Sequence, residues 1–192
     1  MDCTEKLTDN ILYDCTDIAS KGLDGGKAVL INIDDLDRTA TVSDGATITN
    51  LALKSGTTGY SAEWFKDLGS VNSAYAPSTE DIDGFTHNFL CRIATSSADN
   101  AERARELAQG RFIVVVETRY KGTSNTEAFK VMGFVNGLRL SEMTWNTMEN
   151  SGSQVYTATT EDGYYEPYPY NVYLNTDYDT TKADFDSLFA AV

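Results

Sequence analysis

The sequence predicts a mainly β protein with one or two helices, an α+β fold built on an antiparallel β-sandwich or barrel with a flanking helix near residues 99–109. Eleven tyrosines and eight phenylalanines among 192 residues favour strands over helices. A two-residue alternation of side chains over residues 85–95 is typical of a half-buried strand. Directly after it comes one well-bounded helix pattern.

The chain is expected to form a single domain over residues 1–192, because this length and a hydrophobic content of 41% suffice for one sizeable core. Residues 1–27 are polar and punctuated by glycines, so we expect an N-terminal arm that packs either on a neighbouring molecule or on its own domain. Residues 161–192 form a C-terminal segment that ends in a helix.

Short strands and turn signals fill the first half of the chain. The apolar run at 28–33 predicts a strand. Asp44-Gly45 lies between β-rich runs at 38–42 and 46–53, and this dipeptide favours a hairpin because glycine readily adopts positive φ. The remaining expectations are a strand or one helical turn at 60–68 and loops at 54–59 and 69–84.

The predicted helix at 99–109 has a signal at each end. Asp99 is a candidate N-cap, with Glu102 three residues later in a capping-box arrangement. Gly110 suits the left-handed position that follows a helix. Small residues on one side, Ala101, Ala104 and Ala108, would let the helix lie close against a sheet. A helix this short needs tertiary packing to be stable.

The last third of the chain predicts further strands and a terminal helix. Strands are expected at 111–120, 127–135, 138–145 and 153–160, with Asn136-Gly137 as a hairpin turn. Residues 171–174 are expected to form an edge strand. In the helix predicted at 180–189, Phe185, Leu188 and Phe189 lie at i, i+3 and i+4 and give one apolar stripe.

Charge and cysteine content exclude several functional classes. A net charge of −14 disfavours nucleic-acid binding, which depends on Lys and Arg, and disfavours anionic membrane surfaces. No apolar run approaches the ~20 residues that span a bilayer, and no secretory signal is expected at the start of the chain. Three cysteines, Cys3, Cys15 and Cys91, are an odd number at irregular spacing, which indicates a reducing compartment.

Candidates for catalysis and metal binding are few. His87, the single histidine, lies mid-strand among apolar residues and is expected to be structural. Cys91 is four residues further along the same strand, ~13 Å away, too far for a nucleophile–base pair. The acidic clusters at Asp34, Asp35 and Asp37 and at Glu80, Asp81 and Asp83 could hold Ca²⁺ weakly, but neither has EF-hand spacing, so solvated loop charge is the preferred interpretation. We expect no catalytic, cofactor-binding or metal-binding residues and no enzymatic activity.

The aromatic segment at residues 164–170 is the candidate contact site. Tyr164, Tyr165, Tyr168 and Tyr170 are interleaved with two prolines, which bar the segment from central strand pairing. Tyrosine is enriched at protein interfaces, so a subunit interface is the preferred hypothesis. A stacking platform for glycans is the alternative.

The order of these elements resembles that of the tail tube proteins of tailed bacteriophages and the related neck and tail-ring proteins. The resemblance is carried by AERARELAQGRFIVVVE at 101–117 and GFVNGLRLSE at 133–142. The segments EPYPY at 166–170 and TDYDTTKA at 176–183 are similar to virion structural proteins of Bacteroides-type phages and prophages. The resemblance as a whole covers residues 85–192 well and the first 84 residues in outline.

This resemblance implies a sandwich or barrel of tail-tube type whose subunits join sheets edge to edge into rings. Stacked rings would form a tail tube, or a related neck or tail ring, through which DNA passes as cargo. Stacking contacts are expected in residues 1–27, 54–62 or 69–84, and an acidic lumen would repel the DNA. The implied location is the virion tail or neck, assembled in the bacterial cytoplasm with other virion proteins. A terminator or head decoration protein, a glycan- or protein-binding β-sandwich module and a small hydrolase stay open as alternatives.

Overall fold

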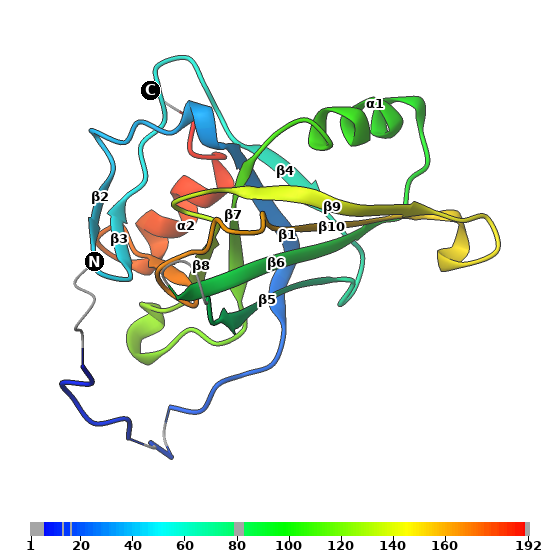
Figure 1. Cartoon of the computed structure of the whole chain (residues 1–192). Coiled ribbons are helices and arrows are strands. Elements are labelled where there is room, and N and C mark those ends of the chain that lie inside the picture. The colour runs from blue at the N-terminus through cyan, green and yellow to red at the C-terminus, as the bar shows by residue number, and fades with distance from the viewer. Residues whose placement is uncertain (1–5, 13, 16, 79–82, 191–192) are drawn as a thin grey trace.

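The computed structural model describes residues 6–12, 14–15, 17–78 and 83–190 (Figure 1). This part of the chain contains eleven strands and two α-helices, so the prediction of a mainly β, α+β fold is confirmed. The strands are β1 (Leu23–Asn32), β2 (Val42–Asp44), β3 (Thr47–Asn50), β4 (Tyr60–Glu63), β5 (Gly69–Ala76), β6 (Gly84–Ile93), β7 (Phe112–Thr118), β8 (Phe129–Met132), β9 (Leu138–Trp145), β10 (Gln154–Thr160) and β11 (Asn171–Tyr173). The helices are α1 (Ala98–Leu107) and α2 (Tyr178–Asp186).

The strands form one hydrogen-bonded sheet that folds over into two layers and does not close into a barrel. The first layer has the order β2-β3-β11-β8-β7-β1-β4, and the second has the order β9-β10-β6-β5. The layers are joined where Phe112 of β7 pairs with Leu138 of β9. All pairings are antiparallel except that of β11 with β3. The described chain is therefore an open sandwich.

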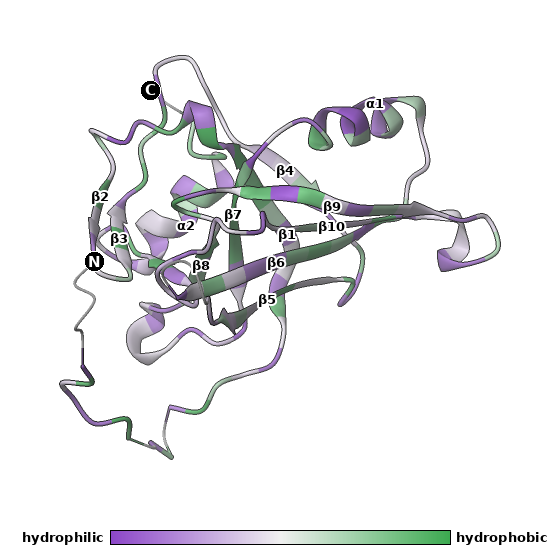
Figure 2. Cartoon of the chain, in the orientation of Figure 1, coloured by the Kyte–Doolittle hydropathy of each residue, from purple (hydrophilic) through white to green (hydrophobic). Residues whose placement is uncertain are grey.

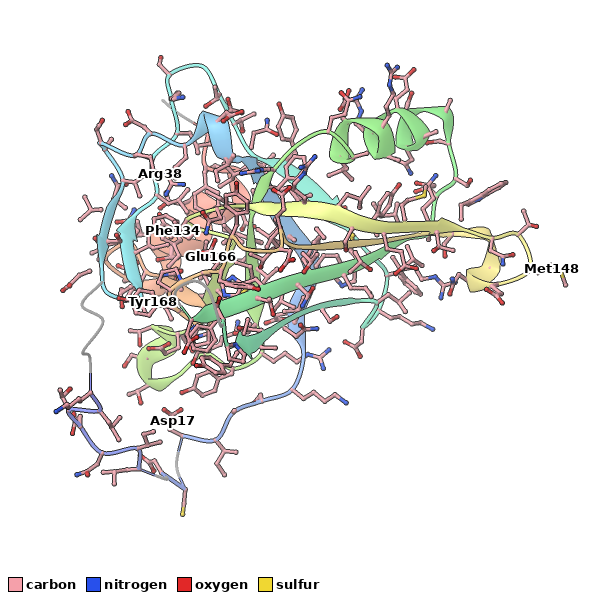
Figure 3. All side chains as sticks on the ribbon, in the orientation of Figure 1. Asp17, Arg38, Phe134, Met148, Glu166 and Tyr168 are labelled. Atoms are coloured by element: carbon pink, nitrogen blue, oxygen red, sulfur yellow. The ribbon has the colours of Figure 1, made fainter. Side chains whose placement is uncertain are left out.

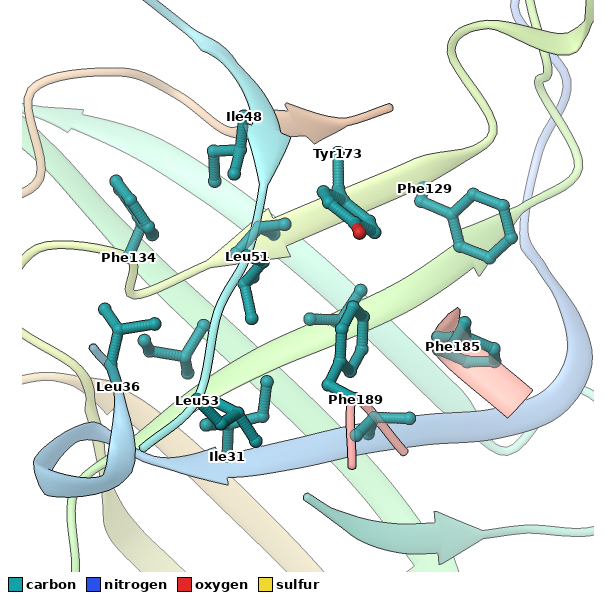
Figure 4. Packing of buried hydrophobic residues seen from close by; sticks show 14 of the residues in the cluster. Ile31, Leu36, Ile48, Leu51, Leu53, Phe129, Phe134, Tyr173, Phe185 and Phe189 are labelled. Carbon is teal, nitrogen blue, oxygen red and sulfur yellow. The ribbon is translucent and has the colours of Figure 1, made fainter. Parts of the chain in front are cut away.

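Residues 28–31 of β1 and 112–116 of β7 are buried on both faces of the sheet, which explains their continuous apolar sequences (Figure 2). Val114 and Val116 face the second layer and pack with Phe89 and Ala158. The opposite face carries a second core that α2 and the 33–58 segment cover (Figure 4). Its buried members include Val29, Ile31, Leu36, Ile48, Leu51, Leu53, Ile113, Val115, Phe129, Phe134, Tyr173, Phe185 and Phe189.

Helix α1 lies where it was predicted, but its ends differ from the expected ones. Ser97, rather than Asp99, is the N-cap, and its Oγ accepts a hydrogen bond from the Asn100 N–H at 3.2 Å. Gly110 does not have positive φ. A Cβ there would lie 2.3 Å from the Phe112 ring, so the position needs glycine for space. No residue of α1 is buried, and only Ala104 and Leu107 of the helix pack against the core.

Helix α2 is fixed to the first layer by packing and by a buried carboxylate. Phe185 is buried against Phe129, with the ring centroids 5.3 Å apart. Glu117 of β7 accepts hydrogen bonds from the Tyr178 hydroxyl at 2.6 Å and from Lys121 Nζ at 2.8 Å. The helix begins two residues before the predicted start and ends at Asp186, so Leu188 and Phe189 follow it with φ of 60° and 55°.

Four expectations for the strands were wrong. Residues 69–76 form strand β5, not a loop, because the second layer supplies β6 as a pairing partner. Strand β11 lies between β3 and β8 and is not an edge. Strands β8 and β9 do not pair as a hairpin: Asn136-Gly137 is part of the corner where the chain passes from one layer to the other. Strand β1 begins at Leu23, within the expected arm.

At 60–68, where a strand or a helical turn was expected, the structure has strand β4.

Candidate subunit interface

The Tyr164–Tyr170 segment is fixed to the protein from beneath by a buried carboxylate. Glu166 is 1% exposed, and its two carboxylate oxygens accept hydrogen bonds from the backbone N–H groups of Val135 (3.0 Å) and Asn136 (2.8 Å). The Asn136 side-chain amide donates in turn to the Tyr165 carbonyl at 2.9 Å. Burial raises the pKa of Glu166, while the two N–H donors act in the opposite direction. Figure 3 shows Glu166 inside this corner, near Phe134.

His87 provides the second attachment of the segment. It is fully buried; its Nδ1 accepts from the Gly133 N–H at 3.0 Å and its Nε2 lies 2.8 Å from the Tyr168 carbonyl. These partners fix a neutral ring with the proton on Nε2. Burial lowers the pKa of His87. The histidine is therefore structural, as the sequence predicted, and connects β6, the corner and the tyrosine segment.

The anchored backbone displays tyrosines to solvent. Tyr164, Tyr168 and Tyr170 are 50%, 37% and 46% exposed. The guanidinium carbon of Arg111 lies 5.3 Å from the Tyr164 ring centroid, and Lys130 Nζ lies 4.7 Å from that of Tyr170. Tyr165 is half-buried, and its hydroxyl donates to Asp162 at 3.1 Å. The structure thus brings the four predicted residues together on one segment with a rigid base and three exposed rings.

Strand β5 presents an open sheet edge that the sequence analysis placed in a loop. Among the described residues, no strand pairs with the side of β5 opposite β6. The Arg92 N–H donates to the Leu68 carbonyl at 3.0 Å, so by antiparallel alternation the backbone groups of Gly69, Val71, Ser73 and Tyr75 point to this edge. Strand β5 contains neither proline nor a charged residue. An edge of this kind is a template for another strand.

A groove of about 690 Å³ runs beside the first half of this edge. It opens between β5 and the region where β1 begins and β7 ends. Apolar parts of its wall come from Leu23, Trp64 and Val71. Lys21 and Arg119 line it as well, with Asp67 2.5 Å from the Arg119 guanidinium. The groove therefore combines apolar surface with a small excess of positive charge.

The hairpin of β9 and β10 extends away from the sandwich and carries a second group of exposed apolar side chains (Figures 1 and 3). Met143, Trp145 and Met148 are exposed along it, and Met148 at the tip is 94% exposed. The Trp145 indole N–H donates to the Gly152 carbonyl at 3.1 Å, which holds the ring against the turn.

Of the other candidate residues, Cys91 and Asp37 lie apart from these surfaces, whereas Asp83 contacts Tyr75 of β5. Cys91 is buried in the core, and burial raises the pKa of its thiol to about 12. Asp37 accepts from the backbone N–H groups of Thr39 and Ala40 and so holds a turn. Glu80, Asp81 and Cys3 lie outside the described residues, and Asp83 accepts from the Tyr75 hydroxyl at 2.5 Å. Within the described ranges, no group of three or more His, Cys, Asp or Glu could hold a metal ion.

Searches for similar proteins found no family model, no curated protein and no solved structure that matches this chain. No helix in the described part of the chain is long and apolar enough to cross a membrane.

Proposed function

We propose that this protein is a non-enzymatic virion structural subunit that self-assembles into rings, stacked as a phage tail tube or as a related neck or tail ring. The observation that carries the proposal is the open edge of β5. Alternate residues of this uncharged eight-residue strand expose unpaired N–H and C=O groups, whereas proteins that remain monomeric usually protect such edges with charge, proline or a covering element.

The position of this edge favours assembly of the ring type. Strand β5 ends one side of the second layer, and β9, a strand of different sequence, ends the other. If β5 of one subunit joins the β9 side of the next, the contact is heterologous. Contacts of this type close into rings or continue into helical filaments.

If subunits extend the second layer edge to edge, its solvent face lines the channel, because the other face packs on the core. Along β6 this face carries Thr86, Asn88, Leu90 and Arg92. On β10 and β9 it carries Val155, Thr157 and Thr159, with Glu142 opposite Thr157. We therefore propose a channel surface of mainly hydroxyl and amide groups, instead of the acidic lumen expected from the net charge, with DNA only as passing cargo.

Replacing Ser73 by proline tests this function. The Ser73 N–H points to the open edge, so proline removes an edge donor without removing a β5–β6 hydrogen bond. We expect wild type and the matched control Ser73→Ala to form large assemblies by light scattering and negative-stain microscopy. Ser73→Pro should remain monomeric with an unchanged circular dichroism spectrum. A wild-type chain that stays monomeric at high concentration, or an assembling Ser73→Pro variant, would contradict the proposal.

A binding module that uses the exposed tyrosines is the second candidate, favoured by the rigid backbone beneath Tyr168. One face of Tyr164 and one of Tyr170 are covered by the protein's own cations, which favours a protein ligand over stacked sugar rings. If the module binds glycans, Tyr168→Ala should abolish binding to a glycan array while keeping the unfolding midpoint within a few degrees. Wild-type protein that binds no glycan on the array would exclude the glycan form of this candidate.

A further inference from the structure

The segment before β1 exposes apolar side chains that nothing in the described chain covers. Leu7, Ile11 and Leu12 are 80%, 88% and 82% exposed, and Ile18 is 61% exposed. Isolated exposed apolar residues are ordinary, but four large ones within twelve positions of the sequence are a concentrated apolar surface. Burial against another surface would remove most of that area from water.

The described residues 6–12 have the side-chain pattern of an edge strand. Residues 6–12 are not a strand within one subunit and bend at Asp9, but once they pair as a strand their alternate side chains share a face, which puts Leu7, Asp9 and Ile11 on one side. Leu12 lies on the other side. The first face therefore presents two large apolar groups separated by one carboxylate.

The groove beside β5 complements this face. A strand added to β5 would continue the second layer and direct alternate side chains into the groove between the layers. Leu23, Trp64 and Val71 offer apolar surface to Leu7 and Ile11. Lys21 and Arg119 offer positive charge to Asp9. Both the backbone groups of the edge and the chemistry of the groove are thus matched by one segment of this chain.

The chain's own segment is directed away from this groove. The Tyr120 hydroxyl donates to Asp17 at 2.9 Å, which holds the segment beside the end of β7. Tyr120 also lies near Lys130 of β8, so this attachment is on the β8 side of the first layer. Figure 1 shows residues 6–12 running outward from the sandwich, away from β5. The occupant that fits is therefore the same segment of a second copy.

We propose that residues 6–12 of one subunit add to β5 of the next subunit as an extra edge strand, with Leu7 and Ile11 in the groove. This rests on the proposed self-assembly and names the segment that occupies the open edge. Each subunit donates one strand to one neighbour and receives one from another, and a contact of this heterologous kind propagates from copy to copy.

A pair of adjacent substitutions in the full-length chain tests the proposal. Ile11→Asp places a charge on the face directed to the groove, and Leu12→Asp places the same charge on the opposite face. Both side chains are more than 80% exposed within one subunit, so neither change disturbs the fold. We expect Ile11→Asp to raise the concentration required for assembly at least ~10-fold, and Leu12→Asp to change it less than ~3-fold.

A photo-crosslinking amino acid at position 11 gives a direct reading of the contact. In assemblies mixed from isotopically light and heavy chains, the expected crosslinks join position 11 of one copy to the Trp64–Val71 region of another. Crosslinks within one chain, or to other surfaces, would overturn the assignment. If Ser73→Pro prevents assembly while Ile11→Asp behaves like Leu12→Asp, the donated strand is wrong and the proposed function stands. A wild-type chain that never assembles would contradict both the donated strand and the proposed function.

Discussion

His87 holds three parts of the chain together, so its replacement by phenylalanine should lower stability through two unpaired groups. The ring bonds the Gly133 N–H at 3.0 Å and the Tyr168 carbonyl at 2.8 Å. Phenylalanine fills a similar volume and pairs with neither. An unsatisfied buried group costs about 1–3 kcal/mol, so the two together cost about 2–6 kcal/mol. The Tyr168 carbonyl lies under an exposed residue and can regain water, which places the expected loss near ~3 kcal/mol.

This loss should depend on pH in a defined direction. Burial lowers the pKa of His87 below its ordinary value of 6.5, so the unfolded chain takes up a proton at a pH where the folded chain does not. The histidine's contribution is therefore complete above pH 6.5 and decreases as the pH falls toward the lowered pKa. The phenylalanine variant has no such titration. The stability difference between the two proteins should be smaller at pH 5 than at pH 7.5.

Urea unfolding followed by circular dichroism at both pH values measures this effect. In a separate thermal unfolding experiment, a loss of ~3 kcal/mol in the free energy of unfolding would lower the Tm of a domain of this size by about 6–12 °C. Asn88→Ala is the control: Asn88 is the next residue of the strand and its side chain makes an exposed hydrogen bond to Asn72, so its loss should stay below ~1 kcal/mol. A His87→Phe loss below ~1 kcal/mol, or one that does not change with pH, would refute the reasoning.

Two further predictions concern buried carboxylates. Glu117→Ala leaves the Tyr178 hydroxyl without its acceptor and should cost about 3 kcal/mol in urea unfolding, with a smaller loss for Glu117→Gln; equal losses would show that the acceptor is unimportant. For Glu166, burial raises the folded pKa above 4.5, so its contribution is complete below pH 4.5 and is lost as the pH rises through the folded value. The stability advantage of wild type over Glu166→Gln should therefore be larger at pH 4 than at pH 7, and an advantage that grows with pH would contradict the raised pKa.

The sequence predicts strands best where side-chain pattern and burial agree. Strand β6 was recognised because Phe89 and Cys91 alternate with polar neighbours, and β7 because five successive apolar residues fit a strand buried on both faces. Strand β5 was missed because Gly69, Ser73 and Ala76 have low strand propensity, and only pairing with β6 makes them a strand. The internal position of β11 depends on β3, more than 120 residues earlier, which local patterns do not reveal.

The tyrosines of the candidate site can be predicted from the sequence, but the residues that hold them in place cannot. The tyrosines between residues 164 and 170 were visible in the sequence as a cluster. Their attachment to His87 spans 81 residues, and the attachment of Glu166 to the corner at Asn136 spans 30. The open edge of β5 and its groove have no sequence signature at all, because an edge is defined by which strand fails to pair with it. The positions of such features follow from topology.

The placement of β11 also has a consequence for biosynthesis. Residues 171–173 bridge β3 and β8, so the hairpin of β2 and β3 has no strand to join until residues more than 120 positions later have left the ribosome. Strand β1 likewise waits for β7, some 80 residues later. Vectorial synthesis therefore cannot complete the first layer from the N-terminus onward. Until β7 has emerged, the nascent chain holds the apolar residues 28–31 of β1 without their partner strand, and an unpaired apolar strand is prone to aggregate.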